Sequence, residues 1–178
     1  MSEPPSANPA TDRGPDAADQ THLPSLGPHG EGWFLLQIVF MALVVLAGIW
    51  LGSNLTGAPR FAASVAGAAL IVADIALGYL GVRDLDRSLS PLPRPRDTAV
   101  LIQDGVYRRL RHPIYAAVIL LALGWSLLMA SLVALALAVA LAVLLDLKAR
   151  REEVWLRQRY PGYAAYAANT KRFVPGIY

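Results

Sequence analysis

Long runs of apolar residues constrain this 178-residue chain more than any other feature. The first run extends from Trp33 to Leu51 and is interrupted only by Gln37. The second extends from Phe61 to Gly81 and contains one ionisable residue, Asp74. As a helix, either run would be about 30 Å long at 1.5 Å per residue, which matches the hydrocarbon core of a bilayer. The sequence therefore predicts two membrane-spanning helices, at about 33–52 and 61–82.

The third apolar run, Ile114 to Leu145, has 32 residues and no charge, which is too long for one span. A single helix of this length would extend about 48 Å. Basic residues crowd both ends of the run, and basic loops stay on the cytoplasmic side of a membrane. Both ends are therefore expected on that side. We predict a tight hairpin of two helices, at about 113–128 and 131–159, with its turn within 126–131.

These runs predict an all-α, polytopic integral membrane protein with about four transmembrane helices, the last two forming the hairpin. Residues 1–30 are rich in Pro, Ala, Asp, Ser and Gly, and such a stretch is expected to be a disordered tail. Residues 31–178 would then form the membrane domain. Pro161-Gly162 is expected to end the fourth helix, leaving a cytoplasmic C-terminal helical segment. We expect both termini and residues 82–113 on the cytoplasmic side.

Composition narrows the classes of function. Only 16% of the residues are charged, against about 25% in ordinary soluble domains. The basic residues concentrate in 82–113 and 146–178, which adjoin apolar runs, so lipid headgroups or a polar pocket explain them better than nucleic acid does. The chain has no cysteine and only three histidines, two of them in the tail, so we expect no metal site. Scarce lysine and abundant alanine suggest a GC-rich coding sequence. We expect the protein in the bacterial inner membrane.

A cluster of basic residues precedes the third apolar run. Pro113 disfavours a helical conformation at His112, so the third helix is expected to begin at Pro113. Its free N–H groups would then face the cytoplasm together with Arg108, Arg111 and His112, with Tyr115 in the first turn. This arrangement could receive a carboxylate or a phosphate, or it could anchor the helix to anionic headgroups.

A pair of acids, Glu152-Glu153, lies among basic residues near the end of the fourth helix. The pair could simply form helical ion pairs with Lys148 and Arg157. Helical spacing also places Trp155 beside Glu152, and a carboxylate beside an indole is a good site for a cation. The two clusters together would suit a ligand that carries carboxylate, ammonium and sulfonium groups. Two further features stay open: Asp74 could be functional or only hydrogen-bonded, and residues 89–97, with three prolines, could line a pocket or form a stiff linker.

The segments "SLSPLPRP", "GVYRRLRHPIY" and "REEVWLRQRYPGYAAYAANTKRFVP" together resemble the isoprenylcysteine carboxyl methyltransferase family. This broad group of integral-membrane methyltransferases includes phospholipid N-methyltransferases. The resemblance implies that S-adenosylmethionine binds at the cytoplasmic side, without a Rossmann fold, and leaves as S-adenosylhomocysteine. The chain departs from the pattern at Ala116–Ala117, where many relatives have glycine. The positions that match the family's cofactor-binding motifs are Tyr107, His112, Pro113, Tyr115, Glu152, Glu153, Tyr163 and Tyr166.

The expected acceptor is a lipidic or isoprenoid molecule that arrives from the bilayer. A carboxylate acceptor, which we favour, needs no base and would be steered by Arg111, Arg151 or Arg172. An amine acceptor would need a proton acceptor, for which Glu152, His112 or Asp74 could serve. We therefore expect Arg111, Arg151 and Glu152 to be the catalytic residues. The alternatives are an NADPH-dependent membrane reductase of the sterol reductase kind and a non-enzymatic membrane scaffold.

Overall fold

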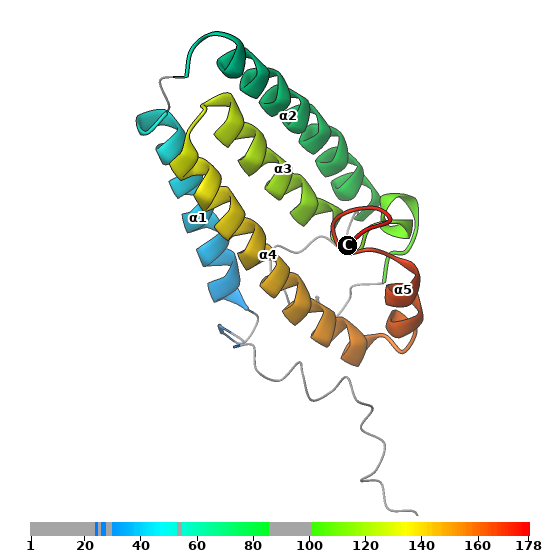
Figure 1. The fold of residues 1–178 in the computed structure, drawn as a ribbon. Coiled ribbons are helices and arrows are strands. Elements are labelled where there is room, and N and C mark those ends of the chain that lie inside the picture. The colour runs from blue at the N-terminus through cyan, green and yellow to red at the C-terminus, as the bar shows by residue number, and fades with distance from the viewer. Residues whose placement is uncertain (1–23, 25, 28–29, 53–54, 86–100) are drawn as a thin grey trace, which may run out of the picture.

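The computed structural model of the chain describes residues 24, 26–27, 30–52, 55–85 and 101–178 (Figure 1). The predicted disordered tail lies almost wholly outside the described residues, and the proline-rich segment 89–97 lies entirely outside them.

The part of the chain that the structure describes is helical, as predicted. A short 3₁₀ helix, η3, precedes the third α-helix, and one isolated parallel β-bridge joins Leu110 to Lys171. The α-helices α1, α2 and α4 are long and apolar enough to cross a membrane, whereas α3 is a shorter apolar helix. The elements in chain order are α1 (Glu31–Trp50), α2 (Gly57–Leu85), η3 (Gly105–Arg108), α3 (Pro113–Leu128), α4 (Leu132–Arg159) and α5 (Tyr163–Asn169).

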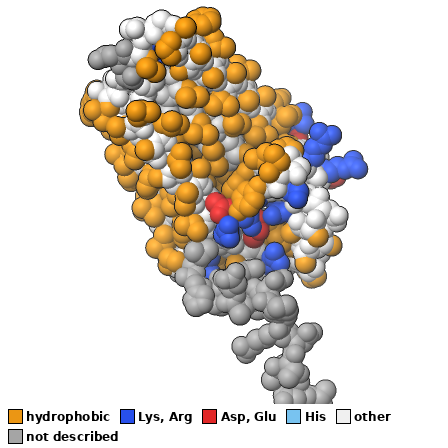
Figure 2. All heavy atoms as spheres, viewed as in Figure 1, with side chains coloured by type: hydrophobic (Ala, Val, Ile, Leu, Met, Phe, Trp, Pro, Cys, Tyr) orange, Lys and Arg blue, Asp and Glu red, His pale blue; other side chains and the backbone are white. Residues whose placement is uncertain are grey.

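Helix α3 lies at the centre of the bundle, with α2 on one side and α1 and α4 on the other (Figure 1). The buried residues Val44, Ala122, Leu141 and Leu145 form the core between α1, α3 and α4. Most other large apolar side chains of α1 and α2 are exposed, and they cover the bundle, while charged side chains gather at one end (Figure 2). An apolar outer surface suits a bilayer. We call the charged end, which carries α5 and the first turn of α3, the polar end.

Two glycines bring α2 and α3 into close contact. A Cβ atom added at Gly67 would lie 2.6 Å from the backbone oxygen of Gly124, and one added at Gly124 would lie 2.9 Å from that of Gly67. Small residues at such crossings let helix backbones approach within a membrane, where lipid is as apolar as the side chains. This contact holds the first half of α2 beside the end of α3. At the other end of the pair, a Cβ atom added at Gly81 would lie 2.9 Å from Cγ1 of Ile114, so the end of α2 lies against the start of α3.

The predicted hairpin turn forms at Met129 and Ala130. The N–H of Ser131 donates to the carbonyl of Ser126, and the N–H of Ala130 donates to that of Leu127, which is the Schellman pattern of a helix end. Ala130 takes the left-handed φ of 49° that glycine usually supplies. The Ser131 hydroxyl accepts from the N–H of Ala134 and so caps α4.

The helix bounds differ from the predicted ones mainly at α2. This helix begins at Gly57, four residues before the expected position 61, because Pro59 fits within the first helical turn, where no N–H donor is needed. Helix α1 begins at Glu31 rather than 33, and α4 ends at Arg159 as expected.

Candidate functional site

A cavity of about 410 Å³ lies at the polar end, where four helices meet. Its volume is in the range of small-molecule binding sites. Its lining combines apolar side chains with charged, amide and aromatic groups. The lining residues are Gln37 of α1, Val82 and Leu85 of α2, Tyr107 and Arg111 of the segment before α3, His112, Pro113, Ile114 and Tyr115 at the start of α3, and Lys148 and Glu152 of α4.

Two features fix the backbone before α3: the proline that begins the helix and hydrogen bonds with the C-terminal segment. Pro113 is the first residue of α3, as predicted, and His112 precedes it with a non-helical ψ of 60°. The N–H of Arg111 donates to the carbonyl of Lys171, and the N–H of His112 donates to that of Arg172. The C-terminal segment therefore fixes the direction in which Arg111 and His112 project.

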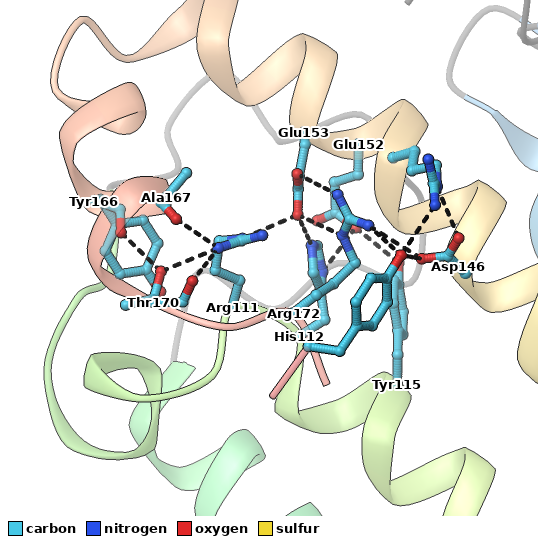
Figure 3. Close-up of polar contacts among 12 residues, drawn as sticks. Arg111, His112, Tyr115, Asp146, Glu152, Glu153, Tyr166, Ala167, Thr170 and Arg172 are labelled. Atoms are coloured by element: carbon cyan, nitrogen blue, oxygen red, sulfur yellow. Dashed lines mark hydrogen bonds and ion pairs between the residues drawn. The ribbon is translucent and has the colours of Figure 1, made fainter. Parts of the chain in front are cut away.

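Glu153 lies at the centre of a buried cluster of charges (Figure 3). Its Oε1 atom accepts from Nε of Arg111 and from Nε of Arg172, each at 3.0 Å, and its Oε2 atom accepts from Nη2 of Arg172. Nε2 of His112 lies 3.2 Å from the same Oε1 atom. The Glu153 side chain is only 5% exposed. Glu153 therefore ties α4 to the segment before α3 and to the C-terminal segment, behind the cavity wall.

Glu152, in contrast, faces the cavity, and its side chain is 22% exposed. The Tyr115 hydroxyl donates to Oε2 of Glu152 at 2.8 Å. Nδ1 of His112 lies 3.8 Å from that atom, and the His112 ring stacks on the Tyr115 ring with a centroid distance of 5.3 Å. The two adjacent acids therefore have different positions: Glu153 is enclosed by cations, and Glu152 presents a carboxylate to the cavity.

Arg111 lines the cavity, but its guanidinium also holds the end of α5. Nη1 donates to the carbonyl of Ala167 at 2.8 Å and to the carbonyl of Thr170 (Figure 3). These carbonyls belong to the last helical turn, where a cation is favoured by the helix dipole. The sequence could not indicate this second task, because Arg111 and Thr170 are far apart along the chain.

Of the four predicted tyrosines, Tyr107 and Tyr115 line the cavity, while Tyr163 and Tyr166 do not. Tyr107 lines the cavity, and its hydroxyl donates to the carbonyl of Gly81 at 3.2 Å. The Tyr166 hydroxyl donates to the carbonyl of Tyr107, while the buried Tyr163 hydroxyl has no hydrogen-bond partner among the described residues. Burial raises the pKa of Tyr166 to about 12, and it also raises the pKa of Tyr107 and Tyr163 above their usual range. All three phenols therefore stay neutral at physiological pH.

The remaining predicted residues lie away from the cavity. The Arg151 guanidinium packs over the Trp155 ring at 5.0 Å, Asp74 lies beside Gly78 on α2, and Arg108 is exposed. None of these three is among the residues that line the cavity.

Arg172 joins the cavity wall to the C-terminal segment. Its Nη1 atom contacts Oδ1 of Asp146 at 3.2 Å and the Tyr178 hydroxyl at 2.8 Å. Burial alone would lower the pKa of Arg172, but the hydrogen bonds with Glu153 raise it. Arg172 therefore stays charged and neutralises Glu153.

Sequence reasoning missed two polar residues of the cavity. The sequence predicts only a possible helical ion pair for Lys148, yet the residue is buried, and its Nζ atom donates to Oε1 of Gln37 at 2.6 Å. The Nζ atom also lies over the Tyr115 ring at 4.9 Å. The signal for Gln37 was present in the sequence, because it is the single polar interruption of the first apolar run.

The cavity thus combines a carboxylate, two cations and the faces of aromatic rings at the boundary of an apolar bundle. Such a set can hold a ligand that carries both charges and a flat ring system. Among the described residues, no group of three His, Cys, Asp or Glu side chains could hold a metal ion.

Comparison with known proteins identifies the family. The sequence model of the phospholipid methyltransferase family matches residues 62–162, which is more than half of the chain. The match includes most of α2 and all of η3, α3 and α4, and it excludes α1. No curated protein matches the chain.

Proposed function

The chain belongs to the phospholipid methyltransferase family, within the group of integral-membrane methyltransferases that the sequence predicted, and on this premise we propose its reaction. The protein transfers a methyl group from S-adenosylmethionine to a lipidic or isoprenoid acceptor. The reaction takes place at the polar end of the bundle, which faces the cytoplasm of a bacterial cell. The family and the apolar helices make the protein a membrane methyltransferase; the cofactor, acceptor and membrane face are the proposal.

The observation that carries the proposal is the carboxylate of Glu152 in the cavity, oriented by Tyr115 and His112. S-adenosylmethionine carries a sulfonium, an ammonium, a carboxylate and an adenine ring. The residues present fit these groups: Glu152 suits the cationic groups, and Arg111 with the first N–H groups of α3 suits the carboxylate. Tyr107 and Tyr115 offer aromatic faces to the ring or to the sulfonium. Glu153, Tyr163 and Tyr166 support these residues from behind.

When bound, S-adenosylmethionine supplies an electrophilic methyl group. The residues of the chain need only align the acceptor with that group, exclude water and balance charge. The apolar lining residues Val82, Leu85 and Ile114 give part of the cavity a surface that does not bind water. The contacts of Glu153 with Arg111 and His112 hold these two side chains in fixed positions at the cavity.

A carboxylate acceptor suits the cavity better than an amine does. A carboxylate releases no proton when its oxygen is methylated, and the cavity is lined by two cations, Arg111 and Lys148, so one can attract the acceptor while the other holds the carboxylate of the cofactor. Of the three arginines that could steer a carboxylate, Arg111 lines the cavity, while Arg151 and Arg172 do not. Methylation of an amine is the second candidate, because Glu152 lies where it could accept the proton.

Ligand binding to the purified, detergent-solubilised protein tests this proposal. We would titrate S-adenosylmethionine, S-adenosylhomocysteine and NADPH into the wild type and into Glu152→Gln and His112→Ala. Arg157→Ala, on an exposed part of α4, is the matched control. We expect both adenosyl ligands to bind the wild type and the control, and to bind both cavity variants at least tenfold more weakly, which corresponds to about 1.4 kcal/mol.

Two results would contradict the proposal. Binding of NADPH in place of the adenosyl ligands would assign the cavity to a reductase. No binding of any of the three ligands would favour a scaffold that binds only lipid headgroups.

A further inference from the structure

Lys148 places a positive charge at the inner part of the cavity. It lies one helical turn before Glu152 on α4, so both side chains line the same cavity, with Lys148 farther from the polar end. The residue is 1% exposed. Burying an ammonium group in a low-dielectric bundle is costly, and a charge at such a position usually marks a functional site.

The partners of Lys148 include residues of α1. Its Nζ atom donates to Oε1 of Gln37 at 2.6 Å and lies 5.7 Å from the centre of the Phe34 ring. The family match begins at residue 62 and does not include α1. Helix α1 therefore contributes to this part of the cavity through residues that the family pattern does not contain.

An apolar groove continues from this point along α1 and α3. The groove has a volume of about 100 Å³ and is lined by Met41, Val44 and Val45 of α1 and by Val118, Leu121, Ala122 and Trp125 of α3. On α1, Gln37 lines the cavity and Met41, one turn further, lines the groove. On α3, Tyr115 lines the cavity and Val118 lines the groove. The Nε2 atom of Gln37 lies 4.0 Å from the sulfur of Met41, so a lining residue of the cavity contacts a lining residue of the groove.

We infer that Lys148 and Gln37 form a subsite for the acidic group of the lipid acceptor, a carboxylate or a phosphate, and that the groove holds the start of its hydrocarbon chain. This inference rests on the proposed methyltransferase function and names the chemistry of its acceptor. The Lys148 ammonium attracts the anion, and the Gln37 side-chain amide can donate a hydrogen bond to it.

The position of Lys148 indicates that the anion it binds belongs to the acceptor and not to the cofactor. Lys148 contacts Gln37, and Gln37 contacts Met41 of the apolar groove, so an anion bound at Lys148 would have the groove nearby for its hydrocarbon chain. Arg111 precedes α3, and its guanidinium contacts the end of α5 at the polar end, where a water-soluble cofactor would bind. The cavity therefore separates two anions: that of the cofactor near Arg111 and that of the acceptor near Lys148.

The test uses the full chain in phosphatidylcholine nanodiscs and three single-chain probes. Oleate is anionic, methyl oleate is its neutral ester, and oleylamine is cationic. Their binding would be measured for the wild type and for Lys148→Met, Lys148→Arg and Gln37→Glu. Lys171→Met is the matched control, because Lys171, the second lysine of the chain, is exposed and does not line the cavity. S-adenosylhomocysteine binding is measured in parallel for every variant.

We expect the wild type and Lys171→Met to bind oleate at least tenfold more tightly than methyl oleate or oleylamine. Lys148→Met should lose this preference, and Lys148→Arg should keep part of it. Gln37→Glu should also abolish the preference for oleate, because the new carboxylate would neutralise the Lys148 ammonium. This variant keeps Lys148, so the test still decides if Lys148→Met does not fold. S-adenosylhomocysteine should bind all variants within about threefold of the wild type.

Equal preference for oleate in the wild type, Lys148→Met and Gln37→Glu would overturn the inference, as would a wild-type preference for oleylamine. Loss of S-adenosylhomocysteine binding in the folded Lys148 variants would also overturn it, because the lysine would then hold the carboxylate of the cofactor. Failure of the wild type to bind S-adenosylhomocysteine would instead count against the proposed function, and the oleate comparison would still decide whether the anion subsite exists.

Discussion

At the scale of single residues, the adjacent acids Glu152 and Glu153 of α4 have different tasks, although they are the same type of residue. Glu153 is surrounded by Arg111, Arg172 and His112, whereas Glu152 faces the cavity beside Tyr115. The sequence predicted both as cofactor-binding residues. The geometry makes Glu153 a positioning residue and leaves the direct contact to Glu152.

The first prediction compares these two acids. Glu153→Gln should lower the free energy of unfolding by about 3 kcal/mol, because it removes the countercharge of Arg111 and leaves Arg172 with Asp146 alone. Glu152→Gln should cost less than about 1 kcal/mol, since a glutamine oxygen can still accept the Tyr115 hydrogen bond. Thermal unfolding of both variants in the same detergent checks this. Equal destabilisation would mean that Glu152 shares the structural task.

The second prediction concerns alkaline pH. A tyrosine hydroxyl in an unfolded chain has a pKa of about 10, and burial raises the pKa of Tyr166 to about 12 in the folded protein. The stabilisation is fully present below pH 10 and is lost as the pH rises toward 12, because the unfolded chain releases the proton first. The loss attributable to this group is about 2–3 kcal/mol.

Unfolding measured between pH 9 and pH 12 tests this second prediction. Tyr166→Phe should be less stable than the wild type at pH 9, where it lacks the hydrogen bond to Tyr107, and its stability should fall less steeply above pH 10. Tyr79→Phe, at an exposed position of α2, is the control and should follow the wild type. A wild-type slope in Tyr166→Phe would show that other groups carry the alkaline loss.

At the scale of elements, the order and type of the helices follow from hydrophobic runs and their interruptions. The sequence correctly predicted the start of α3 at Pro113 and the break between α3 and α4. It did not reveal the manner of the break, because Ala130 does not favour the left-handed conformation that it adopts. The interhelical contact at Gly67 and Gly124 was also not predicted, since many glycines in apolar runs have no such task.

The third prediction tests the turn between α3 and α4. Ala130→Gly should raise the free energy of unfolding by about 1 kcal/mol, because glycine adopts a positive φ without the steric cost that alanine bears. Ala134→Gly, within the first turns of α4, should lower it by about 1 kcal/mol. Thermal or denaturant unfolding of the two variants gives the comparison. A loss of stability in Ala130→Gly would indicate that the methyl group of Ala130 contributes more by packing than its φ costs.

At the scale of the whole molecule, the apolar bundle and its single polar end suit a reaction that joins a water-soluble cofactor to a lipid. Charged side chains gather at that end, and exposed apolar side chains cover the helices (Figure 2). The cavity lies where these two surfaces meet. The predicted topology, with both termini in the cytoplasm, would give the polar end access to the soluble cofactor.

The fourth prediction tests that topology. The chain has no cysteine, so single cysteines can be introduced without removing any. With Ala168→Cys, on exposed α5, a membrane-impermeant thiol reagent should label the protein in inverted vesicles and not in right-side-out vesicles. Thr56→Cys, between α1 and α2, should show the opposite pattern, and the cysteine-free wild type is the control. Labelling of both cysteines from the same side would contradict the four-helix arrangement.

The sequence by itself determined the helices, the break between α3 and α4, and most of the residues at the polar end. These features depend on hydrophobicity and on local backbone preferences, which act over a few neighbouring residues. Only the tertiary structure decided which polar residues face the cavity. Lys148 and Gln37 meet across 111 positions of the chain, and Arg111 reaches the carbonyls that end α5. Helical periodicity assigns each residue to a face, but the packing of neighbouring helices determines what that face contacts.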